Sequence, residues 1–295
     1  MTIDLSGRVA IVTGAGGGLG REHALLLARR GAKLVVNELD AAAAERVVAE
    51  IVAAGGEAVP APASVTDAAQ VEAMMQDAIA RWGRIDILVN NAGILRDKSF
   101  AKMGLDDFRL VMEVHVMGAV HCTKAVWDHM RERNYGRIVL TTSSSGLYGN
   151  FGQSNYGAAK MALVGLMQTL AIEGARNDIR VNCIAPTAAT AMTEGLLPPE
   201  ILARLSPAVV SPGVLALVAE DAPTRTILCA GAGGFEQAHI TLTQGIHVEA
   251  GDGAADAIAA RWGEIADQTG VTVPQAGAAQ GALELSKAMA AVERT

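Results

Sequence analysis

The sequence predicts an α/β fold: one doubly wound parallel sheet of six to seven strands, helices on both faces, and a C-terminal helical extension. Short β-branched runs alternate with Ala- and Leu-rich stretches, and a glycine-rich turn joins the first run to the first helical stretch. The alternation stops after residue 245. Such alternation is typical of βαβ units, in which a helix crosses over between parallel neighbours.

Each predicted strand is a short apolar run rich in β-branched residues. The runs are RVAIVTG (8–14), KLVVNE (33–38), IDILVNNAG (85–93), RIVLTTS (137–143), IRVNCIAP (179–186) and, less regularly, RTILCAGAG (225–233). The helical pattern REHALLLARRG follows the first run, and the Ala-rich segment 40–54 follows the second. Strands and helices therefore alternate along the chain, as a parallel sheet requires.

The chain of 295 residues is longer than one α/β domain of about 200 to 250 residues. We predict one dinucleotide-binding domain over residues 1–245 and an extension over 246–295. Within the domain, residues 187–225 carry several prolines between short apolar pieces, a pattern that favours a substrate lid. The extension contains GAADAIAARWGEIADQTG, whose apolar spacing predicts an amphipathic helix.

The composition excludes several classes of partner. A net charge of -7 disfavours nucleic acid, because binding to a phosphate backbone needs clustered Lys and Arg. No run approaches the roughly 20 apolar residues that span a bilayer, and the N-terminus lacks a secretory n-region, so we expect a cytoplasmic protein. Cys122, Cys183 and Cys229 stand alone, which indicates buried free thiols and neither a disulfide framework nor a metal site. A small-molecule ligand is expected.

The segment TGAGGGLG follows the first strand and opens a helix. In this context backbone N–H groups and the helix N-terminus can hold a pyrophosphate. Leu19 breaks the GxGxxG pattern, and the pattern that fits is TGxxxGxG, with Thr13, Gly14, Gly18 and Gly20. A tight turn without a ligand is the alternative interpretation.

Glu38 ends the second predicted strand, near the offset at which a carboxylate binds the ribose hydroxyls of a dinucleotide. Residues 14–20 contain no Lys or Arg that could bind a 2′-phosphate. Both observations favour NAD over NADP. The alternative is a solvated acid at a strand end.

The stretch TTSSSGLYGNFGQSNYGAAK contains a candidate reaction centre. Ser143 ends a predicted strand, at the edge where open α/β sheets bind ligands. Tyr156 and Lys160 are four residues apart and share one helix face, whereas Tyr148 has no such partner. Oxidation of an alcohol needs a base for the hydroxyl proton, and a nearby cation favours the phenolate of a tyrosine.

The combination of TGxxxGxG, NNAG (90–93), Ser143 and YxxxK resembles the short-chain dehydrogenase/reductase family, whose domain is a Rossmann-type sheet. The resemblance implies that Tyr156 is the catalytic base and that Lys160 both lowers its pKa and holds the nicotinamide ribose. It also implies that Ser143 binds the substrate oxygen. The implied cofactor contacts are Thr13, Gly14, Gly18, Leu19, Gly20, Glu38, Ser64, Val65, Asn91, Ala92, Gly93, Tyr156, Lys160, Pro186 and Ala189.

Three positions depart from the family pattern. His115 in EVHVMG replaces the fourth catalytic residue, usually asparagine. In the family a backbone carbonyl at that position anchors a water, so His115 is either a catalytic-site residue or a packed helical histidine. Thr187 after Pro186 replaces the usual glycine, and Ser64 replaces an adenine-facing aspartate.

Further segments, among them GILRDKSF, GLYGNFGQSNY and IAPTAATAMT, resemble the branch of this family that forms the (3R)-3-hydroxyacyl-CoA dehydrogenase part of peroxisomal multifunctional enzymes. The branch implies NAD and an acyl-CoA, whose phosphates Arg96, Lys98 and Lys102 could bind; solvated surface charge is the alternative. The family also implies a homodimer or homotetramer. The ending VERT is not an SKL-type peroxisomal signal, which agrees with the cytoplasm.

Other functions stay open at this point. An NADPH-dependent 3-oxoacyl-carrier-protein reductase is disfavoured by Glu38, and a steroid or other secondary alcohol dehydrogenase fits the same motifs. A non-catalytic module that senses dinucleotides is disfavoured because it would need neither Ser143, Tyr156 nor Lys160.

Overall fold

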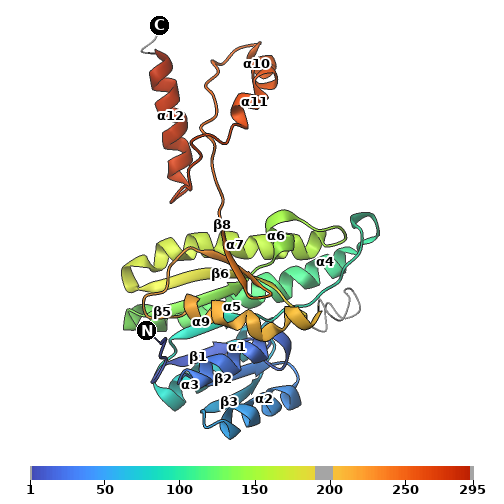
Figure 1. The fold of residues 1–295 in the computed structure, drawn as a ribbon, viewed down its shortest axis with the longest axis vertical. Coiled ribbons are helices and arrows are strands. Elements are labelled where there is room, and N and C mark those ends of the chain that lie inside the picture. The colour runs from blue at the N-terminus through green and yellow to red at the C-terminus, as the bar shows by residue number, and fades with distance from the viewer. Residues whose placement is uncertain (1, 190–201, 293–295) are drawn as a thin grey trace. The chain divides into compact units, whose positions relative to one another are not determined.

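The computed structural model describes residues 2–189 and 202–292 (Figure 1). The chain divides into two compact units, Met1–Gln237 and Ala238–Thr295, and the boundary predicted after residue 245 lies within the second unit. Among the described residues, no helix is long and apolar enough to cross a membrane.

The first unit contains the predicted doubly wound sheet. Its strand order is β3-β2-β1-β4-β5-β6-β7-β8, and every pairing from β3 across to β7 is parallel. The strands are β1 (Val9–Val12), β2 (Lys33–Glu38), β3 (Ala58–Pro62), β4 (Ile87–Asn90), β5 (Gly136–Thr141), β6 (Ile179–Thr187), β7 (Ile227–Gly231) and β8 (Gly234–Ala238). The sheet therefore has eight strands instead of the predicted six to seven.

The two additional strands lie at the edges of the sheet. β3 has the sequence AVPAP, and its prolines are tolerated because an edge strand leaves N–H positions unpaired. β8 follows β7 after Ala232 and Gly233, whose φ values of 51° and 84° suit a tight hairpin turn. Neither strand shows the long β-branched run by which the others are recognised in the sequence.

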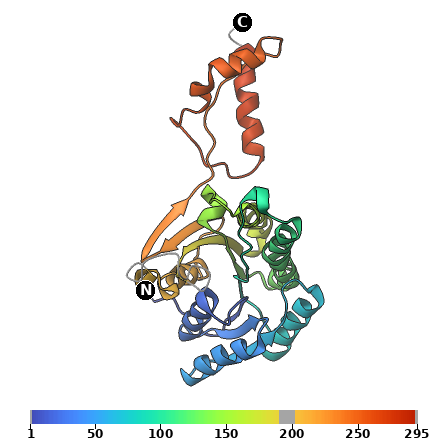
Figure 2. The same ribbon diagram turned by 90° about the vertical axis from the view of Figure 1, so that its right-hand side faces the viewer.

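Helices cover both faces of the sheet (Figures 1 and 2). One layer holds α1 (Gly18–Arg29), α2 (Ala41–Ala53) and α9 (Ser211–Leu217). The other holds α3 (Ala68–Trp82), α4 (Leu105–Met112), α5 (Gly118–Arg133) and α7 (Ser154–Gly174), with the short α6 (Ser144–Tyr148) packed on α7. A π-helical turn, η2 (Glu113–Met117), joins α4 to α5.

Side chains fix where α2 and α3 begin. The carboxylate of Asp40 accepts a hydrogen bond from the Ala42 amide, and Asp67 accepts from the amides of Ala69 and Gln70. These N-caps satisfy donors that the first helical turn leaves unpaired. Single-turn 3-10 helices occupy η1 (Phe100–Lys102), η3 (Ala175–Asn177), η4 (Ala203–Leu205) and η5 (Pro207–Val209).

Part of the segment predicted as a lid belongs to the hydrophobic core. Residues 190–201 of it lie outside the described residues. Val210, Val214, Leu215 and Leu217 are buried in the hydrophobic core that α1 and α2 form against the sheet. The end of the segment therefore belongs to the core, because these apolar residues recur at helical spacing and face α1.

The second unit contains α10 (Ala254–Ala260), α11 (Trp262–Ile265) and α12 (Ala278–Val292). The single amphipathic helix predicted over 253–270 is instead two short helices. The backbone leaves helical geometry at Arg261, with φ −108° and ψ 22°. No described residue of this unit is buried, so its own helices do not enclose a core.

Candidate active site

Hydrogen bonds hold the glycine loop after β1 against the NNAG segment after β4. The Thr13 hydroxyl accepts from the Asn91 and Ala92 amides at 3.0 and 3.1 Å. The Asn91 side chain donates to the carbonyl oxygens of Thr13 and Gly14 at 3.0 and 3.1 Å. The two motifs are distant in sequence, and the parallel pairing of β1 with β4 brings them to one edge of the sheet.

The loop geometry fits a dinucleotide pyrophosphate. Gly14 and Gly18 have φ values of 62° and 51°, which glycine adopts at little cost. A Cβ on Gly20 would lie 2.2 Å from the Gly14 carbonyl oxygen, so helix and loop can approach only with glycine there. The N-terminus of α1 is capped by Gly17 without a side-chain hydrogen bond and has no acid in its first turn, which leaves its N–H groups for an anion.

Glu38 ends β2 with its carboxylate directed at the glycine loop. One oxygen accepts from the Gly16 amide at 3.1 Å, and the other accepts from the Leu39 amide at 2.8 Å. The carboxylate is thereby fixed beside the loop, where it can accept hydrogen bonds from ribose hydroxyls and repel a 2′-phosphate.

Ser64 and Val65 follow β3. The Ser64 hydroxyl pairs with that of Thr66 at 2.8 Å. Val65 is buried, and a Cβ added to Gly118 would lie 2.7 Å from its side chain. The carbonyl oxygen of Val65 lies 3.0 Å from Nδ1 of His121. The structure thus places Val65 against the helix layer that carries η2, and it places the Ser64 hydroxyl in a local turn.

Ser143, Tyr156 and Lys160 come together at the carboxyl end of β5. Ser143 is the N-cap of α6, and its hydroxyl lies near enough to Tyr156, in the first turn of α7, to lower the pKa of that phenol. Nζ of Lys160 lies 5.4 Å from the centroid of the Tyr156 ring and donates to the Thr141 carbonyl at 2.6 Å. One strand end and one helix face therefore assemble the whole group.

Burial decides the pKa values of this group. It raises the pKa of Tyr156, and the hydrogen bond from Ser143 opposes the rise. It lowers the pKa of Lys160 from 10.5 to about 7. The sequence predicted that Lys160 would lower the pKa of the phenol. Here burial is the larger effect, because it disfavours both the phenolate and the ammonium.

His115 lies in η2 and is buried, with its ring edge-on to that of Tyr156 at a centroid separation of 5.3 Å and an interplanar angle of 87°. Its Nε2 lies 2.8 Å from the Ile94 carbonyl oxygen and 3.0 Å from the Ile94 nitrogen. Burial, aided by the charge of Lys160, lowers the pKa of His115 to about 3, so the imidazole is neutral. Its side chain contacts the predicted base and supports the NNAG loop.

The sequence motifs did not identify two further residues beside the site, Asn155 and Gln153. Asn155 is fully buried; its side-chain oxygen accepts from the Tyr156 amide at 2.7 Å, and its side-chain nitrogen donates to the Arg96 carbonyl at 3.0 Å. Gln153 donates to Asp97 at 2.7 Å. An Asn directly before the helical Tyr156 is a residue type that binds nearby backbone groups, which was the available signal.

Pro186 and Ala189 lie at the carboxyl end of β6. Thr187, where the family usually has glycine, still pairs in register with Gly231 of β7, so the strand continues through this position. The Ala189 amide donates to the Leu205 carbonyl at 2.6 Å.

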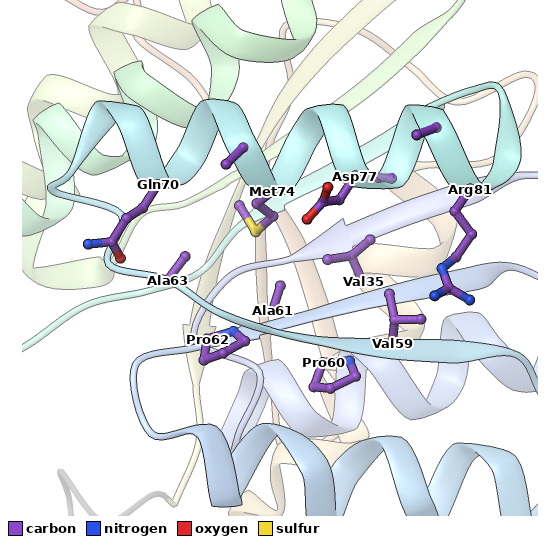
Figure 3. Close-up of a pocket in the computed structure, with 13 residues that line it drawn as sticks. Val35, Val59, Pro60, Ala61, Pro62, Ala63, Gln70, Met74, Asp77 and Arg81 are labelled. Atoms are coloured by element: carbon purple, nitrogen blue, oxygen red, sulfur yellow. The ribbon is translucent and has the colours of Figure 1, made fainter.

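A pocket of about 630 Å³ lies between α3 and the β2–β3 edge of the sheet (Figure 3). Met74 and Asp77 of α3 face Val59 and Pro60 of β3 in this view. Gln70, Asp77 and Arg81 are the polar side chains of the lining, which contains none of the predicted site residues.

A glycine loop after β1 at the centre of a parallel sheet, with a Ser–Tyr–Lys group two strands away after β5, is the arrangement of an oxidoreductase that uses a nicotinamide dinucleotide. Residues 8–200 match the model of the short chain dehydrogenase family. The chain belongs to this family.

Named relatives agree with the family. The chain is 50% identical over 257 residues to peroxisomal multifunctional enzyme type 2 of Drosophila melanogaster, covering 84% of this chain and 41% of that enzyme. The solved structure of that full-length enzyme matches with a TM-score of 0.81 at 40% identity, covering 96% of this chain and 50% of that one. The chain thus spans about half or less of the Drosophila protein.

A Mycobacterium tuberculosis chain named as a short-chain type dehydrogenase/reductase is 45% identical over 276 residues, which cover 90% of this chain and 96% of that one. A solved 7α-hydroxysteroid dehydrogenase, complexed with NADH and 7-oxo glycochenodeoxycholic acid, matches with a TM-score of 0.73 at 33% identity. That match covers 78% of this chain and 95% of the other.

Proposed function

We propose that this protein is an NAD-dependent dehydrogenase that interconverts (3R)-3-hydroxyacyl-CoA and 3-oxoacyl-CoA. The observation that carries the chemistry is the grouping of Ser143, at the N-cap of α6, with Tyr156 and Lys160 on α7, where Nζ of Lys160 lies 5.4 Å from the centroid of the Tyr156 ring. The thioester substrate is supported by the identity to the multifunctional enzyme of Drosophila and by the residues shared with that branch. Steroid alcohols are the second candidate, supported by the 7α-hydroxysteroid dehydrogenase match.

The side chains divide the work of alcohol oxidation. Ser143 donates a hydrogen bond to the substrate oxygen and steadies it, and Tyr156 accepts the hydroxyl proton as the C–H bond breaks. NAD, when bound, accepts the hydride. Lys160, whose pKa of about 7 allows proton exchange near neutrality, stabilises the phenolate while charged. The His115 ring packs nearly perpendicular to the ring of Tyr156, and this contact keeps the base oriented.

We propose that NAD is held by the residues that the family resemblance indicates, and the geometry of the glycine loop supports this. The Thr13–Gly20 loop and the N-terminus of α1 would hold the pyrophosphate. Glu38 would accept from the adenosine ribose, with Ser64 and Val65 near the adenine. Asn91, Ala92 and Gly93, together with Tyr156 and Lys160, would border the nicotinamide ribose, and the strand end at Pro186 and Ala189 would meet the carboxamide.

The cofactor preference tests the role of Glu38. We expect kcat/KM to be higher with NAD than with NADP, and Glu38→Ala to reduce the preference, because the carboxylate both binds the ribose and repels the phosphate. An equal or reversed preference in the unchanged enzyme would remove NAD from the proposal.

A substrate panel tests the activity. The enzyme is assayed for NADH formation with (3R)- and (3S)-3-hydroxyacyl-CoA, steroid alcohols and simple secondary alcohols. Oxidation of the (3R)-thioester far above the others supports the proposal. Activity on steroid or simple alcohols, with none on any thioester, overturns the substrate class and leaves the Ser143–Tyr156–Lys160 chemistry in place.

We also propose the remaining features of organisation that the sequence predicted. These are a catalytic domain over 1–245, with a lid within 187–225 and an extension from 246, and a homodimer or homotetramer. Exposed Leu110 on α4 and exposed Met161 and Ile172 on α7 support an interface on the helices of one layer. Light scattering should give a particle larger than one chain. The cytoplasmic location remains a prediction from the sequence.

A further inference from the structure

The loop after the NNAG segment is bound to the start of the catalytic helix. The Lys98 amide donates to the Gly152 carbonyl at 2.9 Å. The Arg96 carbonyl accepts from Asn155 at 3.0 Å, and Asp97 accepts from Gln153 at 2.7 Å. Three consecutive residues of this loop are thus held against the segment that directly precedes Tyr156. The loop is thus fixed beside the start of α7, close to Tyr156 in the chain.

Arg96 and Lys98 of this loop both pair with the carboxylate of Asp107. Nζ of Lys98 lies 3.2 Å from Asp107, and Nε of Arg96 lies 3.9 Å from its other oxygen. The side chains of Arg96 and Lys98 are 48% and 54% exposed. Both cations pair with Asp107, whereas Asp97, which lies between them in the chain, is hydrogen-bonded to Gln153 instead. Exposed pairs of this kind contribute about 0 to 1 kcal/mol, so an anion can replace or join Asp107 at small cost.

Two exposed phenylalanines lie near these cations in the two hydrogen-bonded chain segments. Phe151, directly before Gly152, is 90% exposed, and Phe100, two residues after Lys98, is 77% exposed. The hydrogen bond between the Lys98 amide and the Gly152 carbonyl joins the two chain segments that carry these rings. Exposed aromatic side chains beside cations are the groups that bind a phosphorylated base, by stacking on the ring and by charge-assisted hydrogen bonds to the phosphates.

We propose that Arg96, Lys98, Phe100 and Phe151, here called the cation–aromatic rim, bind the adenine nucleotide end of a coenzyme A thioester. Arg96 and Lys98 receive the phosphates, and Phe151 or Phe100 stacks on the adenine. The flexible pantetheine arm then leads from the rim to the thioester at Ser143 and Tyr156. The inference rests on the proposed function, and it assigns the handle of that substrate to residues outside the catalytic group.

Two thioesters of the same (3R)-hydroxy acid separate the rim from the chemistry. One carries coenzyme A, and the other carries N-acetylcysteamine, which lacks both the phosphates and the adenine. We expect Arg96→Glu with Lys98→Glu to raise KM for the coenzyme A ester about 10- to 100-fold, since charge-assisted hydrogen bonds contribute roughly 1.5–3 kcal/mol. KM for the truncated ester should stay unchanged. Phe151→Ala should act in the same direction with a smaller factor.

Arg131→Glu is the matched control, because Arg131 is also an exposed cation paired with one aspartate, at the far end of α5. It should change neither KM. The unchanged enzyme should also lose affinity for the coenzyme A ester as salt rises, and the double variant should lose this dependence. An equal effect of the double variant on both esters, or no effect on either, overturns the inference while the proposed function stands.

Calorimetric titration with free coenzyme A gives a readout independent of turnover. We expect binding to the NAD-loaded enzyme that weakens at least tenfold in the double variant and is unchanged in Arg131→Glu. If the unchanged enzyme oxidises neither thioester, the proposed function fails. In that case the titration still tests whether the rim binds coenzyme A. If the unchanged enzyme binds no coenzyme A, or if the double variant binds it equally well, the inference about the rim is wrong.

Discussion

Gly93 of the NNAG segment makes room for the ring of His115. A Cβ at position 93 would lie 2.2 Å from Cε1 of that ring and 2.9 Å from Nδ1. Carbon atoms in contact are normally separated by about 3.5–4.0 Å. Gly93→Ala therefore requires the imidazole or the loop to move by more than about 1 Å.

Such a shift acts on two contacts of His115. It stretches the 2.8 Å and 3.0 Å contacts of Nε2 with the Ile94 backbone beyond hydrogen-bond range, and it disturbs the edge-on packing against Tyr156. Overpacking of this kind costs about 1–3 kcal/mol of unfolding free energy. A displacement of about 1 Å at a catalytic base lowers kcat by on the order of 100-fold.

Steady-state kinetics and urea unfolding of Gly93→Ala measure both effects. Gly281→Ala in α12 is the control, because a Cβ there meets nothing within 4 Å and α12 lies outside the first unit; it should keep activity without loss of stability. Replacing His115 by Ala in the Gly93→Ala background removes the overlap. The two changes should then be non-additive, with the double variant more stable than the sum predicts. Full activity of Gly93→Ala, or strict additivity, would refute this account of the loop.

The remaining predictions concern the catalytic base and the two buried histidines. Tyr156→Phe should keep the buried ring and NADH binding, measured by fluorescence titration, while turnover falls by at least about 100- to 10,000-fold; substantial residual turnover would assign the base to another group. Burial lowers the pKa of His23 and His115 from 6.5 to about 3. Between those values the unfolded chain binds more protons, so the free energy of unfolding falls as the pH drops below 6.5, and His115→Asn should make the fall shallower by up to about 1.4 kcal/mol per pH unit. Ser211→Ala removes the partner 2.8 Å from Nδ1 of His23 and should lower the free energy of unfolding by roughly 1–3 kcal/mol; no change would mean that this hydrogen bond is dispensable.

The sequence predicted the sheet best where strands are buried on both sides. The six predicted runs all contain strands, because central parallel strands are continuous β-branched segments. β3 escaped because Pro60 and Pro62 argue against a strand, and an edge position makes them acceptable. The prolines of residues 187–225, Pro212 among them, predict a cover over the whole segment. Proline is acceptable in the first turn of α9, and the helix is buried against α1.

For the site, sequence by itself determined the residues whose spacing is local. Thr13 to Gly20 form one turn, and Tyr156 and Lys160 share one helix face, so periodicity and glycine chemistry identify them without tertiary contacts. Tertiary structure decided everything that depends on burial and on segments far apart in the chain. The raised pKa of Tyr156, the lowered pKa of Lys160, the packing of His115 over Gly93 and the tie between Asn155 and Arg96 are of this kind. The physical reason is that desolvation and packing depend on how many neighbours surround a group in three dimensions, and a linear pattern does not contain that number.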